Sequence, residues 1–237
     1  MFYPRVIAHR CGGGLAPENT LSGLLIAARI GCRGVEFDAM LDADGVPVLM
    51  HDETLERTTS GCGPVGEARH DELARLDAGI RHHHAFSGEP IPTLKQALNA
   101  CAELGLWANV EIKPSAGREA ETGREVARLA SDFDRILLSS FSSVSLNEAA
   151  LAAARLPRAL LIESLDDWRL AVSEVVVQAV HVAAESATLA GLQPLHAAGI
   201  SVACYTVNDR DVAQRLFSMG VRAIFTDRPD RWPASEM

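Results

Sequence analysis

Short apolar runs alternate with helical segments along almost the whole chain, and this rhythm constrains the fold more than any other feature. Eight runs are predicted as strands: residues 5–8, 35–41, 107–112, 136–139, 159–162, 180–183, 201–207 and 222–226. Helices are predicted between them over residues 21–30, 94–104, 116–130, 144–154, 166–175, 188–198 and 209–218. Glycines follow several of these helices, as expected where an αβ loop begins.

Strands that alternate with helices imply parallel pairing. Eight such units in 237 residues favour closure into a TIM (β/α)8 barrel. An open doubly wound sheet is the structural alternative, and it is weakened because no GxGxxG of the dinucleotide-binding form follows the first strand.

Residues 53–91 interrupt the alternation. They are rich in turn-forming residues and contain only one short helical candidate, at 71–76. A segment of this length is too short to bury an interior of its own. We therefore interpret it as a small insertion after the second strand, and expect residues 1–237 to form a single domain. A turn at 42–45 and an apolar run at 46–50 lead into it.

The charge balance and the cysteines limit the partners. Twenty-two basic residues against 31 acidic ones give a net charge of -9, which argues against nucleic acid or an anionic membrane surface as the main partner. Five cysteines without a CxxC pair indicate reduced thiols. No leader sequence or apolar run of ~18 residues is found, so we expect a cytoplasmic protein without membrane insertion. The oligomeric state stays open.

Three acidic residues are candidate metal ligands. Glu36 and Asp38 alternate along one predicted strand, so their side chains share a face. Two carboxylates held that close repel each other unless a cation lies between them. Glu111 and Lys113 show the same one-residue skip on the strand 107–112, and Glu111 would complete a set of three oxygen ligands. Such a set suits Mg²⁺ or Ca²⁺ better than Zn²⁺. An ion-paired barrel core is the alternative.

Two histidines and two cations accompany these acids at predicted strand ends. Histidine is the side chain whose ordinary pKa lies near neutral, which makes His9 and His51 candidates for the general acid and base, although a single histidine in such a place is more often structural. Arg10 and Lys113 could bind phosphate oxygens. The chain has only two lysines, which makes a specific use of Lys113 more probable than chance. Glu18 and Asn19 are expected to orient His9 or to cap the helix that follows, and Thr20 is the alternative N-cap of that helix.

The motifs, in order along the chain, resemble those of the glycerophosphodiester phosphodiesterases. They are His9-Arg10, Pro17-Glu18-Asn19-Thr20, Glu36-Phe37-Asp38, His51-Asp52, Arg57-Thr58-Thr59, Glu89-x-Ile91-Pro92-Thr93-Leu94, Glu111-Ile112-Lys113, Thr206-Val207-Asn208 and Thr226-Asp227-Arg228-Pro229. The resemblance extends from about residue 5 to 230. Several motifs in the same order are far more specific than any one of them.

The resemblance implies a TIM barrel with an insertion after the second strand, and cleavage of a small-molecule glycerophosphodiester into glycerol 3-phosphate and an alcohol. It also implies roles for single residues: a divalent cation, usually Mg²⁺ or Ca²⁺, on Glu36, Asp38 and Glu111; acid and base in His9 and His51; phosphate contacts by Arg10 and Lys113. In such a mechanism the glycerol 2-hydroxyl, deprotonated by one histidine, attacks phosphorus while the other histidine protonates the leaving alcohol. Water then opens the cyclic phosphate.

Two positions depart from the family pattern. Cys11 stands where the family usually carries glycine after His-Arg, and we interpret it as a small apolar filler. Tyr205 stands where tryptophan is common, which affects the shape of the pocket.

Two competing hypotheses remain. One is a phospholipase-like barrel, either specific for phosphatidylinositol or of the D type. The net charge of -9 and the lack of a membrane-facing aromatic or basic stretch speak against it. The other is a non-catalytic phosphate-binding barrel with a structural cation.

Overall fold

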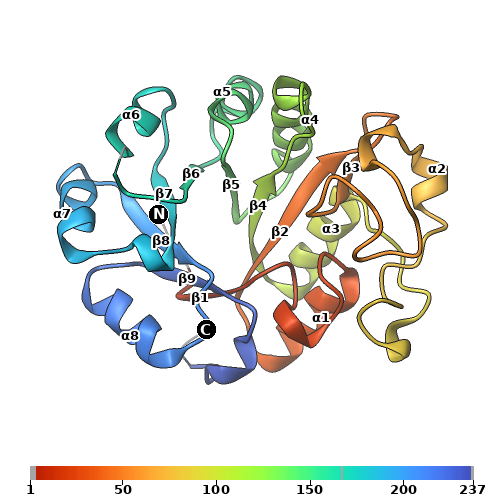
Figure 1. The fold of residues 1–237 in the computed structure, drawn as a ribbon, viewed down its shortest axis with the longest axis horizontal. Helices are drawn as coiled ribbons and strands as arrows, with labels where there is room; N and C mark the ends of the chain where they lie inside the picture. Colours follow the sequence, from red (N-terminus) through yellow and green to blue (C-terminus); the bar gives the residue numbers. More distant parts are fainter. Residues whose placement is uncertain (1–3, 167, 236–237) are drawn as a thin grey trace.

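Eight parallel strands form a closed barrel in the computed structural model, which describes residues 4–166 and 168–235 (Figure 1). They are β1 Val6–Ala8, β2 Gly34–Leu41, β4 Trp107–Ile112, β5 Ile136–Ser140, β6 Arg158–Ile162, β7 Ala179–Ala183, β8 Ser201–Tyr205 and β9 Ala223–Thr226. Each strand pairs with the next, and β1 pairs with both β2 and β9, which closes the barrel. The predicted TIM barrel is therefore confirmed.

Helices surround the strands (Figure 1). They are α1 Leu21–Ile30, α2 His70–Leu73, α3 Leu94–Leu104, α4 Glu119–Ala130, α5 Ser143–Ala152, α6 Trp168–Ser173, α7 Leu189–Ala197 and α8 Arg210–Ser218. The side chain of Thr20 accepts a hydrogen bond from Gly23 N and caps α1, while Thr93 and Gln96 form a capping box on α3. Both helices end at a glycine in the left-handed region, Gly31 with φ 98° and Gly105 with φ 70°.

Several predicted boundaries differ from the structure. The helix predicted over 116–130 begins only at Glu119, because Pro114 and Gly117 hold the preceding loop out of helical geometry. The strand predicted over 201–207 ends at Tyr205. The helix predicted over 166–175 is described as Trp168–Ser173, and residue 167 within it lies outside the described residues.

A ninth strand, β3 Pro47–Leu49, pairs antiparallel with β2. The turn between them is tight because Asp42 Oδ1 accepts hydrogen bonds from the backbone N–H groups of Asp44 and Val46, at 2.9 and 2.8 Å. The apolar run after the turn thus forms a hairpin with β2 and adds no member to the barrel.

The insertion begins directly after this hairpin and returns beside it. Leu49 N donates to Pro92 O at 2.9 Å. The apolar side chains of the insertion pack against the hairpin in one cluster: Met40, Val48, Met50, Leu55, Val65, Leu73, Ala78 and Ile91. The first two belong to β2 and β3, so the insertion packs its apolar side chains against this hairpin.

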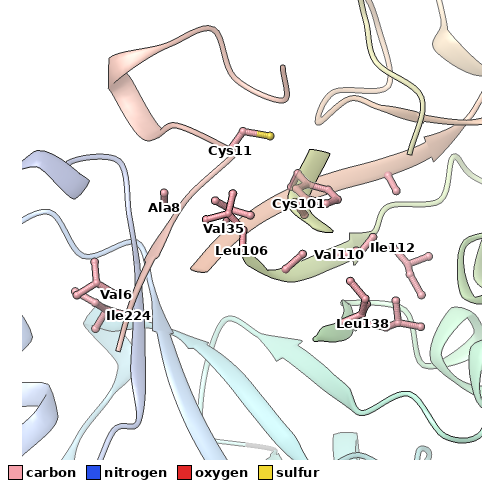
Figure 2. Packing of buried hydrophobic residues seen from close by; sticks show 14 of the residues in the cluster. Val6, Ala8, Cys11, Val35, Cys101, Leu106, Val110, Ile112, Leu138 and Ile224 are labelled. Atoms are coloured by element: carbon pink, nitrogen blue, oxygen red, sulfur yellow. The ribbon is translucent and has the colours of Figure 1, made fainter. Parts of the chain in front are cut away.

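Alternation along the strands separates two apolar clusters. The larger one lies between the strands and the helices; Figure 2 shows part of it, including Val35, Cys101 and Leu106. The smaller one fills the barrel interior towards the amino ends of the strands: Ile7, Trp107, Leu137, Ala159, Ala179, Ala203, Ala223 and Phe225. Polar side chains on β2, β4 and β7 also point into the interior, and the candidate site begins there.

Among the helices that the structure describes, none is long and apolar enough to cross a bilayer.

Candidate active site

The three predicted metal ligands meet inside the barrel. β2 and β4 pair in parallel with Asp38 opposite Glu111 and Glu36 opposite Asn109, which brings all three carboxylates to one side of the interior. One oxygen from each lies within 4.8 Å of the others. Glu36, Asp38 and Glu111 are 3%, 1% and 9% exposed, respectively. Three carboxylates that are buried this close together repel one another unless positive charge lies among them.

The electrostatics of the cluster fit a cation site. Burial raises the pKa of Glu111 to about 8, with Asp38 adding to the rise and Lys113 and Arg10 opposing it. Burial also raises the pKa of Glu36 well above its usual value, followed by the charges of Asp38 and Glu111. Within the described residues, Glu36 Oε1 and Glu111 Oε1 are buried without a hydrogen-bond partner. These all-oxygen donors suit Mg²⁺ or Ca²⁺.

Two other oxygens of the cluster, Glu36 Oε2 and Asp38 Oδ2, are held by the loop after β1. Arg10 N donates to Glu36 Oε2 at 2.8 Å. Asn19 and Asp38 form a reciprocal pair, since Asn19 Nδ2 donates to Asp38 Oδ2 at 2.8 Å and Asp38 N donates to Asn19 Oδ1 at 3.1 Å. This loop therefore fixes the orientation of two candidate ligands.

His9 follows β1 and is held by an acid from the loop after β9. Asp227 Oδ1 lies 2.7 Å from His9 Nδ1, so Nδ1 carries the proton and His9 Nε2 faces Glu36 Oε2 at 3.8 Å. The hydrogen bond from His9 is the main cause that lowers the pKa of Asp227, against the opposing effect of burial. Asn208 holds Asp227 in turn, with Nδ2 donating to Oδ2 at 3.0 Å.

His51 lies after β3 and also has a carboxylate partner. Its Nδ1 is 2.6 Å from Asp52 Oδ1, and its Nε2 is 2.9 Å from Lys113 Nζ. Because an ammonium group only donates, Nε2 accepts and the proton sits on Nδ1. Burial lowers the pKa of His51, and the nearby charges, which act in both directions, leave it lowered. The imidazole is therefore neutral at pH 7.

A cavity of about 190 Å³ joins these groups, about six water volumes. Its lining combines the candidate catalytic groups with a partly apolar wall: His9, Arg10, Glu36, His51, Asn109, Glu111, Lys113, Phe141, Leu161, His181, Tyr205, Thr206 and Phe225. Six of the seven predicted site residues line it, and the seventh, Asp38, lies buried behind them within the acid cluster.

One prediction about the orienting groups is wrong. Glu18 and Asn19 were expected to orient His9 or to cap α1, yet Asp227 holds His9 and Thr20 caps the helix. Asn19 binds Asp38 instead, and Glu18 accepts from Arg10 Nη1 at 3.0 Å. Positive φ values at Arg10 and Asn19, 50° and 58°, turn the loop inward and explain why spacing along the chain misplaced these side chains.

The partnerships of Asp227 and Asn208 were not predicted, although both residues lie in quoted motifs. Their signal was the position of a polar residue directly after a strand. Spacing alone does not reveal that these two loops meet.

The two departures from the family pattern have structural counterparts. Cys11 has φ 75°, a backbone conformation that glycine adopts without strain, and its side chain is fully buried against α1. Burial raises the pKa of its thiol well above the usual value, in agreement with its interpretation as an apolar filler. Tyr205 Oη donates to Ile162 O at 3.0 Å, and its ring meets Phe141 edge to face.

Comparison with known proteins gives one consistent answer. A model described as the glycerophosphoryl diester phosphodiesterase family matches residues 9–231. The chain is similar to a glycerophosphodiester phosphodiesterase of Caldanaerobacter subterraneus subsp. tengcongensis, with 30% identity over 230 residues that cover 95% of this chain and 94% of the relative.

Two solved structures share the fold. One is a phosphodiesterase from Oleispira antarctica in complex with the product sn-glycerol-3-phosphate, with a TM-score of 0.92 and 33% identity over 96% of this chain and 94% of that one. The other is a glycerophosphodiester phosphodiesterase from Agrobacterium tumefaciens, with a TM-score of 0.81 and 26% identity over 96% and 98% of the two chains. Since the family model spans nearly the whole sequence, the chain belongs to the glycerophosphoryl diester phosphodiesterase family of enzymes.

Proposed function

We propose that this protein hydrolyses small glycerophosphodiesters to sn-glycerol 3-phosphate and an alcohol. The observation that carries the proposal is one cavity lined by two carboxylate-paired histidines, two cationic side chains and two members of the buried acid cluster, whose third member is Asp38. Family membership and the product bound by the Oleispira relative support the same reaction.

Glu36, Asp38 and Glu111 would hold a divalent cation, Mg²⁺ or Ca²⁺. When bound, the ion would supply positive charge against the charge that develops on the phosphoryl group. The two carboxylate oxygens without hydrogen-bond partners among the described residues, and the raised pKa of two of the acids, support this assignment.

Arg10 and Lys113 bind phosphate oxygens in this proposal. Both line the cavity beside the acid cluster, and Lys113 Nζ lies 3.7 Å from Glu111 Oε1. An ammonium group that leaves His51 Nε2 to bind a phosphate oxygen frees the lone pair of that nitrogen. Substrate binding and activation of the histidine are then one event.

His9 and His51 form the acid and base pair. In the first step one histidine accepts the proton of the glycerol 2-hydroxyl, whose oxygen bonds to phosphorus, while the other histidine, protonated at Nε2, donates a proton to the oxygen of the leaving alcohol as its P–O bond breaks. In the second step water attacks the phosphorus of the cyclic phosphate, the P–O bond to the glycerol 2-oxygen breaks, and the two histidines exchange roles, which yields sn-glycerol 3-phosphate. Their Nδ1–H groups are engaged by Asp227 and Asp52, which leaves Nε2 of each ring for proton transfer.

The five free cysteines favour a reducing compartment, and we propose that the enzyme acts in the cytoplasm.

A coupled assay for glycerol 3-phosphate tests the proposal. Glycerophosphocholine and glycerophosphoethanolamine are expected to be cleaved with Mg²⁺ or Ca²⁺ and not with EDTA. Phosphatidylinositol vesicles serve as the comparison substrate. The proposal would be contradicted if neither soluble diester released glycerol 3-phosphate, or if only the phosphatidylinositol vesicles were hydrolysed. His51→Ala should bind the cation with unchanged affinity and lose turnover; full turnover in that variant would contradict the assigned chemistry.

A further inference from the structure

Arg57, on the insertion, joins two carboxylates at the rim of the cavity. Its guanidinium donates to both oxygens of Glu18, at 2.8 and 2.7 Å. It also donates to both oxygens of Asp52, from Nε at 2.5 Å and from Nη2 at 3.0 Å. Arginine has a rigid planar fork of donors, so two bidentate contacts fix both acids in one plane.

The two acids contact two different residues of the catalytic cavity. Asp52 Oδ1 receives the Nδ1–H of His51, as described above. Glu18 Oε1 receives the other branch from Arg10 Nη1, at 3.0 Å. A continuous chain of charged hydrogen bonds therefore runs from Arg10 through Glu18, Arg57 and Asp52 to His51.

The charges show that Arg57 is the centre of this chain. Its hydrogen bond is the main cause that lowers the pKa of Asp52. Burial raises the pKa of Glu18, but the hydrogen bonds and charges of Arg57 and Arg10 outweigh it and leave the pKa lowered. Without Arg57, two carboxylates at the rim would face each other with no cation between them and would separate.

We propose that Arg57 is a positioning residue, which holds His51 through Asp52 and the proposed phosphate-binding Arg10 through Glu18, and so fixes the two side chains relative to each other. The proposal rests on the function proposed above. Arg57 does not line the catalytic cavity, so it acts through its two neighbours.

The insertion stays attached to the barrel without this contact. Glu89, near its other end, accepts hydrogen bonds from Ser22 N at 3.0 Å and Ser22 Oγ at 2.5 Å, at the start of α1. The apolar cluster between the insertion and the hairpin adds to this anchoring. Removal of the Arg57 side chain should therefore disturb the charged chain and leave the fold intact.

The geometry also allows the lost group to be replaced from solution. The Arg57 side chain is 46% exposed. A second, polar cavity of about 190 Å³ opens beside it, lined by Pro17, Glu18, Arg57, Thr58, Ala78, Arg81 and His82. In Arg57→Ala this space would grow and admit a free guanidinium ion.

The test compares the unchanged protein with Arg57→Ala, Arg57→Lys and the control Arg75→Ala at saturating Mg²⁺. Arg75 lies on the same insertion, 71% exposed and paired only with Asp71 among the described residues. Arg57→Ala should lower kcat about 10- to 100-fold with unchanged Mg²⁺ affinity, because misplacement of catalytic groups by about 1 Å costs this much. Arg57→Lys should recover only part of it, since lysine cannot bind both acids in bidentate fashion. Guanidinium at non-denaturing concentration should raise kcat of Arg57→Ala, and methylammonium should not.

Each outcome decides between the two proposals. If the unchanged protein releases no glycerol 3-phosphate, both fall. If it does release glycerol 3-phosphate, three results would overturn the positioning role alone. They are a kcat of Arg57→Ala within threefold of that of the unchanged protein, an equal decrease of kcat in Arg75→Ala, and a decrease of kcat in Arg57→Ala that guanidinium fails to restore. A loss restored by guanidinium alone supports it, because a general weakening of the fold would not respond to one cation and ignore another.

Discussion

His181 makes the barrel sensitive to acid, and the size of the effect follows from its position. It lies on β7 between β6 and β8 with 0% exposure, and its ring centroid is 4.9 Å from that of Phe225. Burial lowers its pKa to about 3, whereas a histidine in an unfolded chain titrates at about 6.5. Between these values the unfolded chain binds a proton that the folded chain does not, so stability falls as pH decreases.

At pH 5 the contribution is about 2 kcal/mol, since 1.5 pH units lie between that pH and the unfolded pKa and each unit is worth about 1.4 kcal/mol. At pH 4 it would reach about 3 kcal/mol. A typical domain unfolds with about 5–15 kcal/mol, so one buried imidazole removes a large share of the stability in mild acid.

Urea unfolding at pH 7 and pH 5 measures this. Many groups titrate in that interval, so the comparison must be made between variants. His181→Asn should lower stability at both pH values, but its loss between pH 7 and pH 5 should be about 2 kcal/mol smaller than that of the unchanged protein. His84→Gln, a substitution of an exposed histidine on the insertion, is the control and should keep the original pH dependence. Equal pH dependence of His181→Asn and the unchanged protein would refute the reasoning.

Three further predictions follow from the site and its frame. Since burial raises the pKa of Glu111 to about 8 and that of Glu36 well above its usual value, a cation must displace protons to bind. Its affinity should rise at least about tenfold from pH 6 to pH 7, and calorimetry that shows no change with pH would contradict this. Gly13→Ala should lower the free energy of unfolding in urea by about 1 kcal/mol or more, because φ at Gly13 is 60° and a Cβ there would lie 2.5 Å from Asp227 O. Turnover should fall as well, since the Asp227 side chain holds His9. A variant with unchanged stability and turnover would argue against this geometry. Leu138→Ala, fully buried on the outer face of β5, should lose about 2–5 kcal/mol of stability while cation affinity stays the same; weakened cation binding would show that the two regions are coupled.

The sequence was a good guide where local periodicity determines structure. The eight barrel strands and the meeting of Glu36, Asp38 and Glu111 follow from alternation along strands and from parallel pairing, both of which are local rules. Strand direction was harder. The run that became β3 looks like any other short strand, and only the hydrogen-bonded turn at Asp42 makes it antiparallel.

The groups that orient the site were harder to predict, because they come from loops that meet only after folding. Asp227 holds His9 across a sequence separation of 218 residues, and Arg57 reaches Glu18 across 39. No period or cap specifies such contacts. Motif order indicated that these residues matter, whereas only coordinates show which side chain touches which.

The hairpin of β2 and β3 has a consequence for engineering. His51 follows directly on the ribbon that carries two of the acids, and the insertion leaves and rejoins that ribbon at neighbouring points. One stretch of the insertion, residues 83–85, is exposed and lines neither the catalytic cavity nor the cavity beside Arg57. A fluorophore or affinity peptide attached at that stretch should leave turnover unchanged. The same group attached near Arg57 should lower turnover.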